Sequence, residues 1–257
     1  MASFYEFNAK DTASVVAILA VSIGYSIYWF LSISAKVKKW FFLRFTEDRA
    51  WITYVLFQKI AGLLFMGVLP GIVVVTNTTY SFSDLGVNLF HLNESLLYIA
   101  IIGVLIVTLN FFASKNQNNL NMYPQMRIAS WTKRRIAINS LSWAIYFVGY
   151  EFMYRGLLLM ICYHSFGFWP ALAINLSFYA TTHIAKGLTE TIATFPYGFI
   201  LCFATISTGS ILVAYTTHLI LALSNDFSSV FHQPQMNFNM RGSTLAQKMK
   251  GGGSESE

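Results

Sequence analysis

Long apolar runs, separated by short polar segments, dominate the pattern of this chain. Crossing about 30 Å of hydrocarbon takes roughly 20 helical residues, and most of the runs reach or approach that length. The later runs are shorter and more polar, as expected of helices that other helices shield from lipid. We therefore predict an all-α fold, a polytopic transmembrane bundle of about seven spans, with six or eight still open. The runs are Thr12–Ser34, Trp51–Val75, Ser95–Ala113, Ile136–Tyr163, Phe168–Ile184, Thr191–Ser207 and Ser210–Ser224.

The composition supports a membrane protein and argues against a soluble one. The 257 residues are 55% hydrophobic and 11% charged, whereas soluble domains carry about 25% charged residues. The first run has no basic leader and no Ala-x-Ala site, so we expect a retained span and not a cleavable signal peptide. The net charge of +6 is better explained by membrane topology and contact with lipid headgroups than by binding of nucleic acid.

The positions of lysine and arginine predict the orientation of the bundle, since cytoplasmic loops carry an excess of both. Seven spans place nearly all of the 17 cations in one set of loops and only Lys10 in the opposite set. We therefore expect the N-terminus outside and the C-terminus in the cytoplasm, in a bacterial inner membrane or plasma membrane. Lys59 and Arg155 lie inside spans. We expect the Lys59 ammonium to extend toward the cytoplasmic interface, with a salt bridge to Glu151 as the alternative.

The chain is predicted to form one integral membrane domain, residues 1–232, followed by a disordered cytoplasmic tail, residues 233–257. The tail is polar, lacks hydrophobic periodicity and closes in a glycine-rich stretch. Val37–Phe45 alternates basic and aromatic residues, which is typical of an anchor at the membrane surface. Met122–Trp131 is predicted to form a short interfacial helix.

Charged and imidazole side chains within the apolar runs are the main functional signal. Glu151 and Arg155 lie in the middle of one run, four residues apart and so on one helix face. A charge at mid-membrane costs about 2.5–3.5 kcal/mol, so it is seldom retained without a role. His183 and His218 occur in two later runs, and Tyr179 lies one turn before His183. A structural ion pair and histidines that only bond neighbouring helices remain the alternatives.

The cysteines and a set of three possible zinc ligands are the remaining candidate sites. Cys162 and Cys202 lie within apolar runs and are interpreted as small buried hydrophobes. Glu151, His183 and His218 could supply three zinc ligands and leave a position for water, but no Cys/His metal spacing accompanies them. We therefore expect no cofactor.

The order and spacing of three motifs resemble the CPBP family of intramembrane proteases, which includes the CAAX prenyl endopeptidases and Abi-type proteins. The family's Glu-Glu-x-x-x-Arg motif corresponds to Tyr150-Glu151-Phe152-Met153-Tyr154-Arg155. Its Phe-x-x-x-His motif corresponds to Tyr179–His183, and its His-x-x-x-Asn motif corresponds to His218–Ala222. The resemblance covers about residues 136–226.

This resemblance implies metal-free hydrolysis of a peptide bond in a membrane-associated substrate. Glu151, His183 and His218 would be the catalytic groups, and they would activate water and stabilise the oxyanion. Arg155 would hold and charge-balance Glu151, with Tyr150 and Tyr179 in supporting positions.

Two departures from the motifs keep a second function open. Tyr150 stands where the family has its first glutamate, and Ala222 stands where it has asparagine. Loss of one oxyanion donor can cost about 10²–10³ in rate. The alternative is therefore a non-catalytic family member, a pseudoenzyme that acts as a membrane scaffold or regulates a partner such as a cell-envelope enzyme. A transporter is the weakest option, because the sequence shows no inverted repeat.

Overall fold

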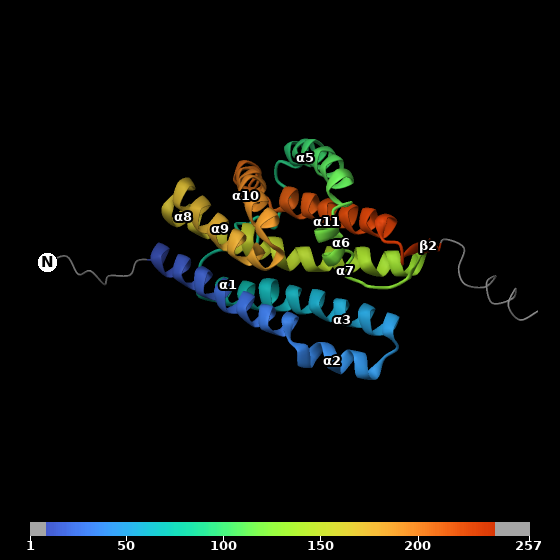
Figure 1. Cartoon of the computed structure of the whole chain (residues 1–257). Coiled ribbons are helices and arrows are strands. Elements are labelled where there is room, and N and C mark those ends of the chain that lie inside the picture. Colours follow the sequence, from blue (N-terminus) through green and yellow to red (C-terminus); the bar gives the residue numbers. More distant parts are fainter. Residues whose placement is uncertain (1–8, 240–257) are drawn as a thin grey trace, which may run out of the picture.

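Helices make up nearly the whole computed structural model, which describes residues 9–239 (Figure 1). The prediction of an all-α fold is confirmed, apart from one pair of three-residue strands. The α-helices are α1 (Ala9–Ile33), α2 (Ala35–Arg44), α3 (Glu47–Gly62), α4 (Leu69–Asn77), α5 (Leu92–Ala113), α6 (Gln117–Met122), α7 (Lys133–Glu151), α8 (Ile161–Phe166), α9 (Phe168–His183), α10 (Leu188–Thr208) and α11 (Leu212–His232). Two π-helices, η1 (Leu63–Val68) and η2 (Phe152–Met160), and one 3₁₀ turn, η3 (Ile184–Lys186), join some of them.

Five helical stretches among the described residues are long and apolar enough to cross a membrane. Helix α9 has 16 residues, and α11 carries several polar residues in its second half, so neither is in this group. The protein is an integral, multi-pass membrane protein, whereas the count of seven spans and the orientation stay predictions. The five stretches are Asp11–Ile33, Glu47–Asn77, Leu92–Ala113, Lys133–Phe166 and Leu188–Thr208.

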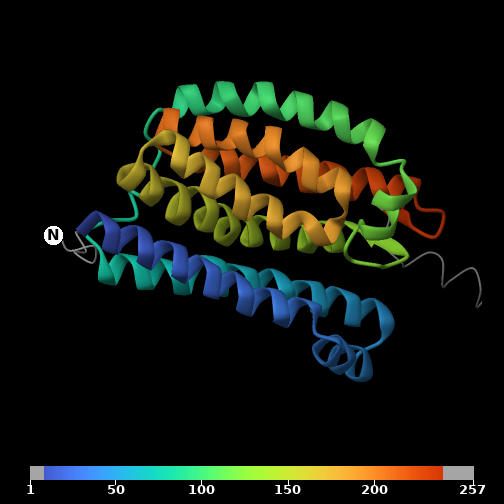
Figure 2. The same cartoon turned by 60° about the vertical axis from the view of Figure 1, so that its left-hand side comes forward.

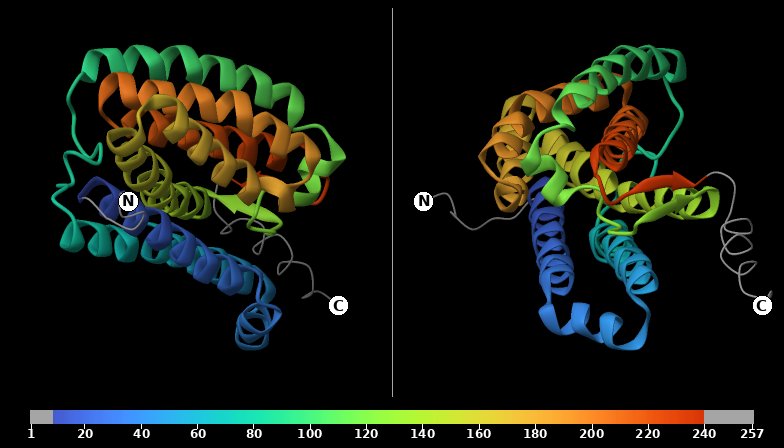
Figure 3. Two further views of the ribbon diagram at one scale, coloured as in Figure 1. Left: turned by 90° about the vertical axis from the view of Figure 1, so that its left-hand side faces the viewer. Right: turned by 45° about the vertical axis from the view of Figure 1, so that its right-hand side comes forward.

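The stretch α7–η2–α8 forms the axis of the molecule. Helix α1 and the stretch α3–η1–α4 pack on one side of it, while α9, α10 and α11 pack on the other sides (Figures 2 and 3). Helix α5 covers the outer face of α11 (Figure 2). In the most apolar window of each stretch, 83% of the residues are buried for Lys133–Phe166 but only 17% for Asp11–Ile33 and Leu92–Ala113. The polar residues of the central stretch are therefore shielded from lipid by protein.

The central stretch touches its neighbour backbone to backbone near its middle. A Cβ atom on Gly67 would lie 2.6 Å from Cα of Gly149, and one on Gly149 would lie 2.7 Å from Cα of Leu63. Any larger residue at either glycine would force the two helices apart. Both helices have a π-helical segment at this crossing, η1 and η2. Such segments occur often at functional sites, and η2 begins directly after Glu151.

Several local predictions need correction. The predicted interfacial helix at Met122–Trp131 is wrong: α6 ends at Met122, and irregular backbone then leads to β1 (Ser130–Thr132). The predicted tail is ordered at its start, since β2 (Asn237–Asn239) pairs in parallel with β1. The Gln233 side chain, just before β2, donates to the Leu120 backbone oxygen of α6 at 2.6 Å, a contact that the sequence pattern did not indicate. The remainder of the predicted tail, residues 240–257, lies outside what can be described, as does the side chain of Lys10. The segment at Val37–Phe45 forms α2, none of whose residues is buried.

Lys59 does not extend toward an interface, so that prediction is wrong. Its side chain is 3% exposed, and Nζ lies 2.9 Å from the centroid of the Trp143 ring. The alternative pairing with Glu151 is not formed either, because that carboxylate contacts His218 and Arg155. The face of the Trp143 ring stabilises the ammonium inside the protein, so the side chain does not have to reach the membrane surface.

Candidate functional site

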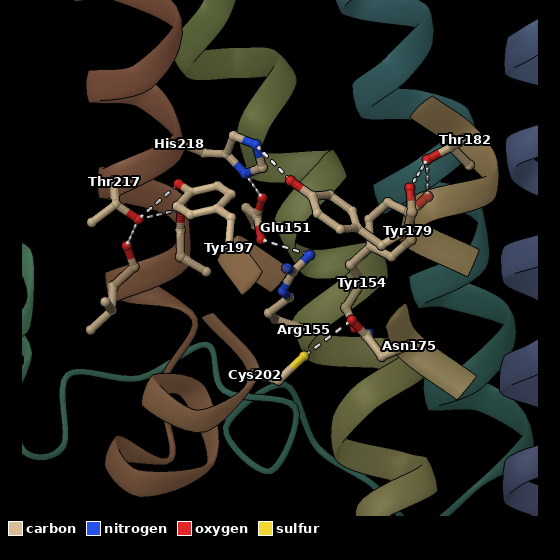
Figure 4. A network of polar contacts seen from close by, with 12 residues as sticks. Glu151, Tyr154, Arg155, Asn175, Tyr179, Thr182, Tyr197, Cys202, Thr217 and His218 are labelled. Carbon is tan, nitrogen blue, oxygen red and sulfur yellow. Dashed lines mark hydrogen bonds and ion pairs between the residues drawn. The ribbon is translucent and has the colours of Figure 1, made fainter. Parts of the chain in front are cut away.

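Glu151 and His218 form the centre of a buried polar site. Glu151 is the last residue of α7 and His218 lies in the middle of α11, and their side chains are 0% and 6% exposed. Glu151 Oε1 accepts a hydrogen bond from His218 Nδ1, and Arg155 Nη1 lies 3.6 Å from Glu151 Oε2 (Figure 4). The contact between Glu151 and Arg155, predicted from their spacing on one helix face, is confirmed. Glu151 is therefore shared between a cation on its own helix stretch and an imidazole from a distant one.

The second nitrogen of His218 faces a hydroxyl group. Tyr179 on α9 places its phenol oxygen 3.2 Å from His218 Nε2. With Nδ1 donating to the carboxylate, a neutral His218 has its lone pair on Nε2 and accepts from the Tyr179 O–H. Phe147 stacks on the imidazole with centroids 4.9 Å apart, and the rings of Tyr150 and Tyr197 approach edge-on at 5.5 and 5.2 Å. Aromatic rings thus fix the imidazole plane.

Arg155 is fully buried with few direct partners. Its Nε, Nη1 and Nη2 atoms have no hydrogen-bond acceptor among the described residues. The Glu151 Oε2 atom likewise has no hydrogen-bond donor among them. Arg155 Cζ lies 4.7 Å from the centroid of the Tyr179 ring. Buried donors without acceptors are costly, so these N–H groups and the Glu151 Oε2 atom, which has an ion-pair contact but no hydrogen bond in the described part of the chain, are positions where a polar ligand or water would be stabilised.

His183 lies beyond Tyr179 and not directly on the carboxylate. Its side chain is buried, its Nδ1 lies 2.8 Å from the backbone oxygen of Tyr179, and the two rings are 4.6 Å apart. Tyr179 also contacts His218, with ring centroids 6.1 Å apart. The structure therefore brings Glu151 and His218 together directly, and places His183 one aromatic ring away.

The two positions that depart from the family motifs are close to this centre. Tyr150 packs against the His218 ring, and Ala222 is buried one turn further along α11. Asn225 does not replace the missing asparagine, because its amide donates to Asn119 Oδ1 at 3.1 Å. No other amide among these α11 positions reaches the imidazole.

A second layer of polar contacts was missed by the sequence analysis. Asn175, 0% exposed, donates to the Tyr154 backbone oxygen at 2.7 Å and accepts from the Cys202 thiol at 3.2 Å. Tyr154 and Thr182 hydroxyls lie 2.9 Å apart (Figure 4). The rule that drew attention to Glu151, a polar group inside an apolar run, would also have found Asn175. Cys162 and Cys202 are free and buried, as predicted.

Charged groups at the end of α9 connect the site to the loop at residue 123. Lys186 Nζ donates to the Tyr123 hydroxyl at 3.3 Å and lies 3.5 Å from Glu190 Oε2. Burial raises the pKa of the Tyr123 phenol above its ordinary value, so the phenol stays neutral near neutral pH. Over residues 9–239, no group of three or more His, Cys, Asp and Glu side chains is arranged to hold a metal ion.

Comparisons with known proteins identify the domain that holds this site. Residues 135–224 match the family model of the type II CAAX prenyl endopeptidase Rce1-like proteins. No curated protein and no solved structure gives a match. The matched range agrees with the predicted 136–226 and contains Glu151, His183 and His218. Over this segment the chain is similar to the type II CAAX prenyl endopeptidases, in agreement with the resemblance of its motifs.

Proposed function

We propose that the protein is an intramembrane endopeptidase that hydrolyses a peptide bond of a membrane-associated substrate. The observation that carries the proposal is the buried Glu151–His218 hydrogen bond, with His218 Nε2 directed at a hydroxyl group. A carboxylate on one imidazole nitrogen selects the tautomer in which the other nitrogen is basic, which is the arrangement that general-base hydrolysis needs.

In the proposed reaction, His218 Nε2 takes a proton from water as the water oxygen attacks the peptide carbonyl carbon. Glu151 stabilises the imidazolium that forms, and Arg155 keeps the carboxylate ionised and in place. The tetrahedral intermediate collapses when His218 returns the proton to the departing amine. His183, which packs on the Tyr179 ring, is assigned a positioning role.

Tyr179 is the candidate oxyanion donor. The motif has phenylalanine at this position, and the additional hydroxyl lies 3.2 Å from His218 Nε2. A tyrosine O–H is one of the side-chain donors that stabilise oxyanions, and it would compensate for Ala222, which has no donor. The same hydroxyl must leave Nε2 when substrate binds, so a shift of the Tyr179 side chain is part of the proposal.

The test is cleavage of quenched fluorescent peptides by the purified protein in lipid nanodiscs. The name of the matched family points to prenylated peptides as the first substrates to try, with the same peptides lacking the lipid as controls. Glu151→Gln should abolish cleavage and leave folding intact. Glu94→Gln, at a side chain 60% exposed, should have no effect. Equal cleavage by the wild type and Glu151→Gln would exclude the proposed chemistry.

A non-catalytic scaffold is the second candidate, and Tyr150 and Ala222 favour it. Both positions lack the polar group that the motif carries, and Glu151 is already paired with His218 and Arg155. In this case Glu151→Gln should preserve the effect of the protein in cells, and the protein should co-purify with a membrane partner. An effect that is lost in the Glu151→Gln strain while the protein level is unchanged would exclude the scaffold.

A further inference from the structure

A second group of buried charges lies away from the Glu151–His218 centre. It joins Lys59 of α3, Asn139 and Trp143 of α7, and Asp226 of α11, all at most 5% exposed. Asp226 Oδ2 accepts from Asn139 Nδ2 at 3.0 Å and from Trp143 Nε1 at 2.7 Å. Lys59 and Asp226 both lie outside the matched segment 135–224, so the family motifs do not account for them.

The two charges meet on one indole ring. Lys59 Nζ lies 2.9 Å from the centroid of Trp143, while Asp226 binds the N–H on the edge of the same ring. The ammonium also lies 4.5 Å from the Tyr146 ring. A cation over an aromatic face is attracted most strongly when both are removed from water. The indole is therefore held on its face and on its edge by groups from two other helices.

This indole starts a stack of rings that ends at the site. Trp143 and Phe147 are nearly parallel, at 13° with centroids 5.2 Å apart. Phe147 and His218 are also nearly parallel, at 15° with centroids 4.9 Å apart. Trp143, Phe147 and Glu151 repeat every four residues along α7, so the stack follows one face of that helix to the carboxylate. A displacement of the indole would reach His218 through a single intervening ring.

We propose that Lys59 and Asp226 are positioning residues for His218. They clamp Trp143, and through Phe147 they hold the imidazole plane in line with Glu151. The consequence for hydrolysis rests on the proposed function, but the position of His218 can be measured without turnover. The competing interpretation is that the charges only join α3, α7 and α11, in which case their loss would lower stability without selective effect on His218.

The experiment measures how fast diethylpyrocarbonate modifies each histidine of the folded protein in nanodiscs, by peptide mass spectrometry. Lys59→Met removes the cation, and Lys59→Arg keeps it. Lys38→Met is the matched control, since Lys38 Nζ also lies over a ring, 4.5 Å from the centroid of Trp51, but on the exposed helix α2. The exposed His91 serves as the internal reference in every variant.

We expect His218 modification to rise about 10-fold in Lys59→Met, the order that loss of a desolvated cation–π contact allows. Lys59→Arg should restore the wild-type rate, and Lys38→Met should not change it. If Lys59→Met does not fold, Trp143→Phe decides, because it keeps a ring in the stack but loses the N–H to Asp226, and a smaller rise is expected.

Several outcomes would overturn the proposal. One is a wild-type His218 rate in folded Lys59→Met or, if that variant does not fold, in Trp143→Phe. Another is an equal rise in Lys38→Met, which would indicate general loosening. A protein with no peptidase activity but with this selective rise would overturn the proposed function and leave the positioning role in place.

Discussion

The Glu151–Arg155–His218 site and the Lys59–Trp143–Asp226 cluster are two solutions to the same problem, a carboxylate buried in a membrane protein. Glu151 is bound by an imidazole and faces an arginine whose N–H groups lack acceptors. Asp226 is bound by two neutral donors, Asn139 and Trp143, and the nearby Lys59 Nζ lies over the rings of Trp143 and Tyr146. The first arrangement contains a histidine, the side chain whose ordinary pKa lies nearest to neutral pH, and the second contains no histidine.

This difference indicates separate roles for the two groups, a proposed reaction at Glu151–His218 and structural support at Lys59–Asp226. The first set lies wholly within the segment that matches the family, and the second takes Lys59 and Asp226 from outside it. Neutral donors hold the Asp226 carboxyl group in a fixed geometry, which suits a structural clamp. A histidine between a carboxylate and a hydroxyl can change its protonation and its partners, which suits a reaction centre.

The largest expected effect comes from removing the cation of the first site. Arg155→Met should lower the free energy of unfolding by about 3–5 kcal/mol, because it leaves a buried carboxylate without its positive partner. The double variant Glu151→Gln with Arg155→Met should lose less than the sum of the two single changes. Denaturant unfolding in detergent measures both. Additive losses would mean that the two residues are not coupled.

Tyr179→Phe tests the hydroxyl at the proposed reaction centre. If Tyr179 is the oxyanion donor, kcat should fall about 10²–10³-fold with the fold intact. The neighbouring Tyr197→Phe, which removes a 3.4 Å bond to Thr217, is the control and should have a much smaller effect. A higher rate in Tyr179→Phe would instead identify the hydroxyl as a block on His218 Nε2.

Restoring both missing motif residues tests whether the first site retains the shape of a peptidase site. Tyr150→Glu combined with Ala222→Asn should raise cleavage of the prenylated peptides by up to about 10²-fold, since it adds an acid and an amide donor beside His218. The rate in nanodiscs, with the amount of folded protein controlled by size exclusion, is the measurement. No gain in a folded double variant would argue that the site has diverged beyond these two residues.

Asn139→Ala should have a smaller effect, because it acts only on the support cluster. It leaves Asp226 Oδ2 with Trp143 as its one remaining donor, and about 1–3 kcal/mol of stability should be lost. Thermal unfolding in nanodiscs tests this. A loss as large as that of Arg155→Met would remove the distinction between the two buried carboxylates.

An exposed carboxylate gives the smallest effect and the reference for the two buried ones. Ser81 donates to Asp84 through its hydroxyl at 2.6 Å and its backbone N–H at 2.8 Å, and these bonds lower the pKa of Asp84. Because the folded-state pKa is lowered, the stabilisation is present above the unfolded value of about 3.9 and lost as the pH falls below it. The unfolding midpoints of wild type and Asp84→Asn should differ slightly at pH 6 and converge as the pH falls through the folded-state pKa of Asp84. A difference that does not change with pH would contradict this assignment.

The sequence predicted what depends on apolar length and on isolated charges. The helices, the Glu151–Arg155 contact and the family segment follow from residue patterns within single helices. The direction of the His183 ring, the Lys59–Trp143 contact and the β1–β2 pair depend on which helices or strands become neighbours. The periodicity of a single helix carries no information about that choice. Lys59 is an example. Its neighbours in the sequence are those of a lysine that extends to the membrane surface, but in the fold its ammonium lies over aromatic rings of α7.

The π-helical segment η2 has a consequence for how this protein can vary in length. A π turn holds one more residue than an α turn, so a one-residue deletion within Phe152–Met160 would allow a regular α-helix to form. The later residues would then keep roughly the same angular positions relative to Glu151, whereas the same deletion in a regular α-helix would rotate them by about 100°. A one-residue gap in an alignment at this position would therefore be compatible with the same packing of α8 and α9, whereas a one-residue gap within α7 would place the later residues out of register.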